Sequence, residues 1–252
     1  MGKQALNKVA KITILFWIMK ILATTLGETL GDLLSMTLNL GYIYGLLITT
    51  FVFLIVLFFQ LKSSKFHSFL YWSVIVGTTT VGTEVSDFMD RTLGLGYVIG
   101  SSILLLGLLS IFSIWYYREK ELAIYPIIKF RIEMFYWVAI LFSNSLGTAF
   151  GDFLSDNLEL GYINGSLVTA SIILVVIILH YATKINQALL FWIAFIFTRP
   201  FGATFGDFLT KPVQKGGLNI GTIPSSIVTF FILFILLIWS ELKEKTENKL
   251  PI

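Results

Sequence analysis

Long apolar stretches alternate with short polar connections along the whole chain. The apolar stretches cover roughly residues 12–37, 42–61, 66–90, 96–117, 127–155, 161–182, 187–209 and 218–240. Each stretch is long enough for the ~20 residues that a membrane-spanning helix requires. The pattern therefore predicts an all-α integral membrane protein, with one membrane domain (residues 1–252) and eight transmembrane helices.

Every second stretch contains an aromatic–Trp pair and, fifteen residues after the Trp, an aspartate. The four pairs are Phe16-Trp17, Tyr71-Trp72, Tyr136-Trp137 and Phe191-Trp192, and the four aspartates are Asp32, Asp87, Asp152 and Asp207. An ionised side chain at the middle of a bilayer costs about 2.5–3.5 kcal/mol on insertion scales, so such residues are rarely without a role. Four aspartates in register are the strongest pointer to function in the sequence.

The chain is built from four tandem repeats, predicted at residues 12–62, 66–118, 127–183 and 187–241. Each repeat has two spans, so all four enter the membrane in the same direction and are related by axes along the membrane normal. We expect four helical hairpins around a pseudo-fourfold or a twofold axis. The longer middle offset comes from the connector REKELAIYPIIKFRIE, which suggests that a pair of repeats was itself duplicated.

The repeat cores carry a family resemblance, for example FWIMKILATTLGETLGDLLSMTLNLGYIYG in repeat 1 and YWVAILFSNSLGTAFGDFLSDNLELGYING in repeat 3. Over residues 12–240 the chain resembles the DUF347 repeat family, bacterial membrane proteins with four tandem two-helix repeats of unknown function. The resemblance implies an eight-helix bacterial membrane protein and supplies no catalytic or binding residues. Repeat 4 departs most from the pattern, with Arg199-Pro200 and the longer loop KPVQKGGLNIGTIPS.

Composition and charge placement agree with a membrane location. The chain is 56% hydrophobic and 13% charged, whereas soluble domains carry about 25% charged residues. The N-terminal tail, the connections after every second span and the C-terminal tail hold thirteen Lys and Arg, and the other connections hold three: Arg91, Lys211 and Lys215. The positive-inside rule then predicts a multi-pass protein of the bacterial plasma (inner) membrane with both termini in the cytoplasm.

Small residues precede each aspartate in the odd-numbered spans. They form the pairs Gly27/Gly31, Gly82/Ser86, Gly147/Gly151 and Gly202/Gly206. Such small-xxx-small pairs let helix backbones approach closely in lipid. We therefore expect the four odd-numbered spans to pack against protein, with their aspartates facing or bordering the interior of the bundle.

Oxygen-bearing side chains around these aspartates suggest a cation site. The candidate residues are Glu28, Asp32, Glu84, Asp87, Asp152, Asp207, Thr25, Thr80 and Asn144, and the candidate metal ligands among them are Glu28, Asp32, Glu84 and Asp87. Carboxylate and hydroxyl oxygens are the ligands that hard cations prefer. Glu28 and Glu84 are the favoured functional carboxylates, because they lie deeper than the aspartates and occur only in repeats 1 and 2.

The number of acidic side chains in the predicted spans exceeds the number of basic ones, and this excess suggests a mechanism. Six embedded carboxyls face two embedded bases, Lys20 and Arg199, which we assign to charge balance or gating. Four carboxyls must then be protonated, hydrated or bound to a cation, and clustered carboxyls of this kind can exchange protons for cations. We predict a proton-coupled cation transporter. A divalent ion such as Mn²⁺ or Mg²⁺ fits oxygen-only ligation, and monovalent cations or organic amines fit as well.

One other interpretation of the function is open. The protein could be a structural or sensory membrane protein without transport, whose aspartates tether the outer loops by accepting backbone N–H bonds; Asp152 and Asp207 suit this role best. We expect the four repeat tryptophans to lie in an interfacial aromatic belt.

Without cysteine, paired histidines, an HExxH motif or a phosphate-binding loop, we expect no enzymatic activity. The expected partners are the lipid bilayer and a small cation, with no nucleic acid and no cofactor beyond a bound cation.

Overall fold

The structure, a computed structural model, describes residues 7–247, and this part of the chain forms eight α-helices and no strand. The helices are α1 Ile14–Asp32, α2 Gly41–Lys62, α3 Ser68–Asp87, α4 Gly96–Glu119, α5 Phe130–Asp152, α6 Gly161–Ala182, α7 Gln187–Thr210 and α8 Thr222–Glu247. The predicted all-α class is confirmed. Lys3 and Lys249, which contribute to the charge bias, lie outside the described residues.

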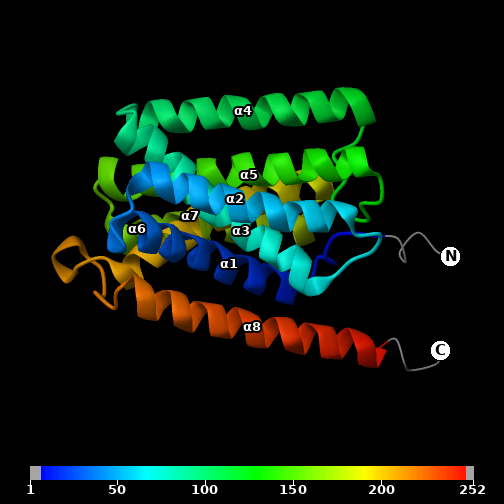
Figure 1. Ribbon diagram of the computed structural model, residues 1–252. Helices are drawn as coiled ribbons and strands as arrows, with labels where there is room; N and C mark the ends of the chain where they lie inside the picture. The colour runs from blue at the N-terminus through cyan, green and yellow to red at the C-terminus, as the bar shows by residue number, and fades with distance from the viewer. Residues whose placement is uncertain (1–6, 248–252) are drawn as a thin grey trace.

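Six of the described helices are long and apolar enough to cross a membrane, and the protein is a multi-pass membrane protein. The two helices that do not reach this threshold are α3 and α5, which carry more polar side chains than the others. Both lie in the middle of the bundle, parallel to the apolar helices (Figure 1). Their polar side chains are therefore shielded by protein rather than exposed to lipid.

The odd-numbered helices form a closed inner ring in the order α1, α3, α5, α7 and back to α1. The even-numbered helices pack on the outside of this ring, α2 against α3, α4 against α5, α6 against α7 and α8 against α1. The second helix of every repeat thus packs against the first helix of the next, and the last repeat closes on the first. Of the pseudo-fourfold and twofold arrangements that the parallel repeats allow, this cyclic order is the pseudo-fourfold one.

Glycines hold the inner ring together. One glycine of each inner helix abuts a residue of the next helix around the ring: Gly27 meets Thr79, Gly82 meets Asn144, Gly147 meets Arg199 and Gly202 meets Thr24. A methyl group added at any of these glycines would overlap its neighbour. The prediction that the small-xxx-small pairs pack the odd-numbered helices against protein is confirmed.

The first three helices of the ring share one local structure at the end that carries the aspartates, which we call the outer end; the opposite end is the inner end. After its aspartate, each helix continues into a five-residue π turn: Leu33–Thr37, Phe88–Thr92 and Phe153–Asn157. A glycine with positive φ then begins the next helix (Gly41, Gly96 and Gly161). Repeat 4 lacks this turn and has instead the loop from Lys211 with the short 3-10 helix Val213–Lys215. The departure of repeat 4 seen in the sequence is therefore a different outer connection.

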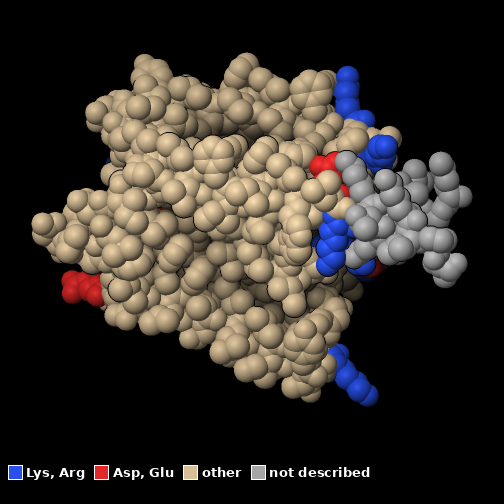
Figure 2. Space-filling model, turned by 90° about the horizontal axis from the view of Figure 1, so that it is seen from below, with Lys and Arg blue, Asp and Glu red and all other residues tan. Residues whose placement is uncertain are grey.

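The flank of the bundle is apolar, and its charged side chains gather at the two ends (Figure 2). The outer helices carry the exposed apolar residues, for example Leu47 and Phe51 on α2 and Leu106 on α4. The first helix begins and the last helix ends at the same end of the bundle (Figure 1). An even number of spans requires this arrangement.

The expectation of an interfacial tryptophan belt is wrong. Trp72, Trp137 and Trp192 are buried, and Trp17 is half-buried. Together with the aromatic residue that precedes each of them, they fill the ring at the end opposite to the aspartates, where the hydroxyls of Tyr71 and Tyr136 hydrogen-bond at 2.7 Å. The reason is geometric: aromatic side chains at equivalent positions of four neighbouring helices pack against one another. They close this end of the bundle.

Candidate functional site

The interior of the inner ring is lined by residues spaced four apart, and all of them are buried. We name these residues the axial ladder: Phe16, Lys20, Thr24, Glu28 and Asp32 on α1; Tyr71, Ile75, Thr79, Thr83 and Asp87 on α3; Tyr136, Ile140, Asn144, Thr148 and Asp152 on α5; Phe191, Phe195, Arg199, Ala203 and Asp207 on α7. Residues spaced four apart share one helix face. From the inner end outward, the ladder changes from aromatic to basic and neutral polar, and then to acidic.

Two basic side chains join the four aspartates in pairs at the outer end. Lys211 Nζ lies 2.5 Å from Asp32 Oδ2 and 3.2 Å from Asp207 Oδ1, which links α1 to α7. Arg91 links α3 to α5 in the same way, with distances of 3.1 Å to Asp87 Oδ1 and 3.4 Å to Asp152 Oδ2. Each base follows the aspartate of its own repeat by four positions, and repeats 1 and 3 have no base there. The outer layer therefore has twofold symmetry within a fourfold ring.

One buried ion pair lies directly beneath this layer. Arg199 donates a hydrogen bond from Nη2 to Glu28 Oε2 at 2.8 Å and another to Thr83 Oγ1 at 2.6 Å. Neither charged side chain of the pair is more than 4% exposed. The three residues belong to α7, α1 and α3, so the pair ties three of the four inner helices together.

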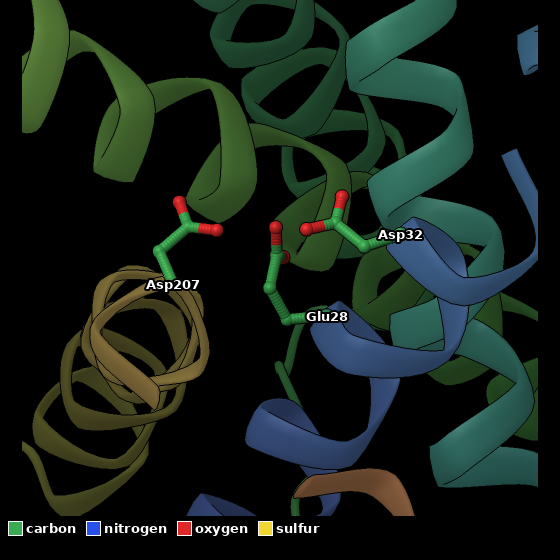
Figure 3. Close-up of side chains that lie close together, drawn as sticks. All are labelled: Glu28, Asp32 and Asp207. Atoms are coloured by element: carbon green, nitrogen blue, oxygen red, sulfur yellow. The ribbon is translucent and has the colours of Figure 1, made fainter. Parts of the chain in front are cut away.

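Three carboxylates converge at this level. Glu28, Asp32 and Asp207 each present an oxygen within 4.8 Å of the others, and all three are buried. Figure 3 shows their carboxylates turned toward one another from α1 and α7. The cations that compensate them are Arg199 on Glu28 and Lys211 on the two aspartates. We name these three residues the central carboxylate cluster.

Lys20 lies further toward the inner end, and its direct contacts are with neutral side chains. Its ammonium donates a hydrogen bond to Asn144 Oδ1 at 3.0 Å and lies 4.0 Å from the centre of the Phe195 ring. Asn144 in turn donates to Thr78 Oγ1 at 3.0 Å. All four inner helices contribute to this network. Among the described residues Lys20 has no carboxylate partner, whereas Arg199 has one.

The structure does not bring every candidate to the axis. Glu84 is fully buried, but it points outward to α2, where a methyl group added at Gly45 would lie 2.7 Å from both of its carboxyl oxygens. The hydroxyl of Thr80 hydrogen-bonds to a carbonyl of its own helix, and Thr25 is buried without a hydrogen-bond partner. Glu84 therefore lies apart from Glu28, Asp32 and Asp207 in this structure. Asp87 and Asp152 border the axis, where Arg91 holds them.

The aspartates do not accept loop backbone N–H groups within the described part of the chain. Their partners are the side chains of Lys211 and Arg91. The ion pairs of Lys211, which follows α7, attach its loop to Asp32 and Asp207, and those of Arg91 join α3 to α5.

Lys211 is the group of this layer that lies outside the helices, in the loop that follows α7. Burial disfavours its charged form, but the Asp207 and Asp32 carboxylates outweigh burial and raise the pKa of the Lys211 ammonium above its usual value. Lys211 is therefore a cation at any physiological pH.

Four segments of the chain match a family described as Repeat of Unknown Function (DUF347), at residues 15–66, 70–121, 135–186 and 190–246. The protein belongs to the DUF347 family. The resemblance that the repeat cores carry is thus confirmed. Neither the curated proteins nor the solved structures include a significant match to the chain.

The second and fourth DUF347 repeats supply the two residues that sequence reasoning missed. In the sequence Arg91 and Lys211 look like loop charges. Each nevertheless lies one helical turn after its aspartate, on the same helix face as the axial ladder. Their inclusion changes the charge bookkeeping. The axis holds five carboxylates, Glu28 and the four aspartates. The four cations on it are Lys20, Arg199, Arg91 and Lys211. The excess of negative charge is therefore one, compared with the four carboxyls without a base that the sequence indicates.

Proposed function

We propose that this DUF347 protein moves a cation across the membrane in exchange for protons, with Glu28, Asp32 and Asp207 as cation ligands. The observation that carries the proposal is the convergence of these three buried carboxylates within 4.8 Å inside a closed ring of helices. Oxygen-only ligation suits Mg²⁺, Mn²⁺ or a monovalent cation.

Lys211 supports this proposal, because its ammonium already lies where a cation would bind. It is 2.5 Å from Asp32 and 3.2 Å from Asp207, and it belongs to a loop rather than to a helix. A cation that arrives from the outer end displaces the ammonium and takes over its two carboxylates. The lysine is then a tethered competitor that keeps the cluster neutralised between binding events.

Proton exchange follows from electrostatics. A bound cation stabilises the ionised form of buried carboxyls near the cluster and so favours release of a proton from one that is protonated. When the cation leaves, a buried carboxyl that no base neutralises takes up a proton again, because an unpaired buried negative charge is costly. Arg199 compensates Glu28 throughout, and the aromatic layer at the other end of the ring separates the cluster from the cytoplasm in the orientation proposed below.

Flux measurements in liposomes test the proposal. The protein is reconstituted with an internal pH dye, and Mn²⁺, Mg²⁺, Na⁺, K⁺ and organic amines are added in turn. We expect cation-dependent proton flux for the wild type and at least a tenfold loss in Glu28→Gln and Asp207→Asn. Asp156→Asn, which removes an exposed acid outside the cluster, is the matched control and should retain the flux. Absence of flux for every cation, with folded protein, would sink the proposal.

The alternative function is a structural or sensory protein without transport. The two pairs of ion-bridged aspartates favour it, since Lys211 and Arg91 tie neighbouring helices together at the outer end. In that case Asp207→Asn lowers stability and changes no flux, whereas a transporter loses flux even in variants that remain folded. The same liposome assay, combined with thermal unfolding, separates the two functions.

We also propose that both termini lie in the cytoplasm of the inner membrane, on the basis of the thirteen-to-three bias of Lys and Arg. The chain has no cysteine, so single cysteines can be introduced without background. We expect a membrane-impermeant thiol reagent to label Lys215→Cys from outside intact cells and to leave Lys184→Cys unlabelled. The opposite labelling pattern would reverse the orientation.

A further inference from the structure

Glu84 differs from the other buried acids of the inner ring in having no partner. Glu28 and the four aspartates each form at least one ion pair. Glu84 is 0% exposed, and neither of its carboxyl oxygens has a hydrogen-bond partner among the described residues. An isolated ionised carboxylate in such a place is very costly, and a group in this position takes up a proton instead. The surroundings of Glu84 therefore decide whether its carboxyl is protonated or ionised.

The repeats themselves show that an acid is not required at this position. Glu84 follows the tryptophan of its helix by twelve residues, and the equivalent residues are Thr29, Ala149 and Thr204. Thr29 hydrogen-bonds to Ser226 of α8 at 2.8 Å, and Thr204 hydrogen-bonds to Ser166 of α6 at 2.7 Å. In repeats 1 and 4 a threonine here joins the inner helix to the outer one. Repeat 2 has a carboxyl in this place, and Gly45 of α2 leaves the space for it.

Among the described residues, no cation lies in position to neutralise Glu84. The only charged residue of α2 is Lys62 at its far end, and its titratable groups nearer Gly45 are Tyr42 and Tyr44. Helix α1 contributes Glu28 and Asp32, which are also negative when ionised, and α3 itself contributes Asp87.

The other helices that pack against α3 carry no base near Glu84 in the described residues. Glu133 and Arg131 of α5 lie at its inner end, and so do Glu241 and Lys243 of α8. Asp152, at the outer end of α5, is held by Arg91. The surroundings of Glu84 thus offer further negative charge, which favours the protonated acid.

We propose that Glu84 is a proton-binding site at the seam between α2 and α3, separate from the central carboxylate cluster, and that it holds the proton exchanged for the cation. The second half of this statement rests on the proposed transport function, and the first half does not. Glu84 lies three residues before the end of α3 and therefore only ~4.5 Å deeper than the aspartate layer, at 1.5 Å per residue. It is near enough to the outer end to exchange protons there, while its side chain remains off the axis.

Infrared difference spectroscopy tests the first half. Spectra of the wild-type protein in lipid at pH 7 are compared with those of Glu84→Thr, which copies the residue found in repeats 1 and 4. We expect the difference to contain the carbonyl stretch of a protonated carboxylic acid. The control is the difference spectrum between the wild type and Asp156→Asn, which removes an exposed acid. That spectrum should contain carboxylate bands instead. A carboxylate difference for Glu84 overturns the proposal, whether or not the protein transports anything. Glu84→Gln, which has the same shape, provides the same comparison if the threonine variant does not fold.

Flux measurements test the second half. In Glu84→Thr we expect cation binding at the central cluster to persist while cation-driven proton release is lost, whereas Glu28→Gln loses both. If Glu84→Thr releases protons as the wild type does, another group carries the proton and the second half is overturned. A wild type without any flux overturns the transport function and with it this assignment, while the spectroscopic result on the protonated acid stands by itself.

Discussion

Glu28 and Glu84 lie on neighbouring helices of the same ring, and their surroundings are opposite. Glu28 faces the axis, where Arg199 neutralises it and two aspartates lie nearby. Glu84 faces an outer helix, where it meets a glycine and no partner. The difference comes from register. Glu28 follows its tryptophan by eleven residues and Glu84 by twelve, and one residue rotates a side chain by about 100° around a helix.

Two acids at the same depth in the membrane do not necessarily belong to one site. Both acids precede the aspartate layer by about one turn, and the sequence alone made them look like a pair. The ring separates them, because only every fourth residue from the aromatic layer outward faces the axis. Five predictions test the partners and surroundings of the buried acids, from the largest expected effect to the smallest.

Removal of Arg199 should be the most damaging change. In Arg199→Met, Glu28 becomes an unpaired buried carboxylate, and loss of one partner of a buried ion pair costs about 3–5 kcal/mol. We expect the free energy of unfolding, measured by denaturant titration in detergent, to fall by that amount. The double variant Arg199→Met/Glu28→Gln should recover part of the loss. If the single variant is as stable as the wild type, Glu28 is already protonated and the contrast with Glu84 disappears.

Lys211 should matter less, because its side chain is partly exposed. Lys211→Met leaves Asp32 and Asp207 without their shared partner, and we expect a loss of about 1.5–3 kcal/mol, the range for hydrogen bonds to charged groups. Lys215→Met, a change to an exposed lysine of the same loop, is the control and should have little effect.

The pH dependence of the Lys211 contribution can be derived from its pKa, which is raised above the usual 10.5. A raised pKa gives stability that is fully present below the unfolded-state value and is lost only as the pH rises through the folded-state value. The stability difference between wild type and Lys211→Met should therefore stay constant from pH 7 to pH 9. A difference that shrinks within this range would contradict the ion-pair assignment.

Gly45→Ala tests the environment of Glu84 directly. The added methyl group would lie 2.7 Å from the carboxyl oxygens, and overpacking of this kind costs about 1–3 kcal/mol. Glu84→Thr should remove most of that cost, which a double-mutant cycle measures as a coupling energy. Gly165→Ala, the equivalent change on α6, meets only side-chain atoms at 3.3 Å and should cost less. Equal losses at the two glycines, without coupling to Glu84, would place the carboxyl elsewhere.

The smallest effect is expected for Glu84→Gln. A protonated glutamic acid and a glutamine have nearly the same shape and are both neutral, so we expect a change of less than about 1.5 kcal/mol, the usual limit for volume-conserving substitutions. Glu28→Gln should cost more, because it leaves Arg199 as an uncompensated buried cation. Thermal unfolding of the two variants side by side checks this order. If Glu84→Gln is the more damaging of the two, Glu84 is ionised.

Much of the fold could be predicted from the sequence. The apolar stretches predict the eight helices, the repeats predict parallel hairpins around a pseudo-fourfold or a twofold axis, and the glycine pairs indicate which helices approach one another. The tryptophan prediction failed because interfacial preference is a statistical tendency, whereas four aromatic pairs at equivalent positions of a closed ring can bury one another. The cyclic packing of each outer helix on the next repeat was not predictable, since hydropathy does not specify which neighbour a helix chooses.

The candidate site was predicted only in part. Glu28, Asp32 and Asp207 are three of the predicted carboxylates, and they do converge. Arg91 and Lys211 were missed because they follow the last apolar residues and look like loop charges, although their spacing of four from Asp87 and Asp207 placed them on the ladder face.

The sequence by itself determined that this is a helical membrane protein of four parallel repeats, because bilayer thickness and helix periodicity act on local stretches of the chain. Only the tertiary structure decided which acids share a site. Partners such as Arg199 and Glu28 are 171 residues apart in the chain, and their contact depends on closure of the ring. The partner that each buried charge finds, or in the case of Glu84 does not find, depends on helix rotation and on the neighbouring helix, and neither is encoded locally.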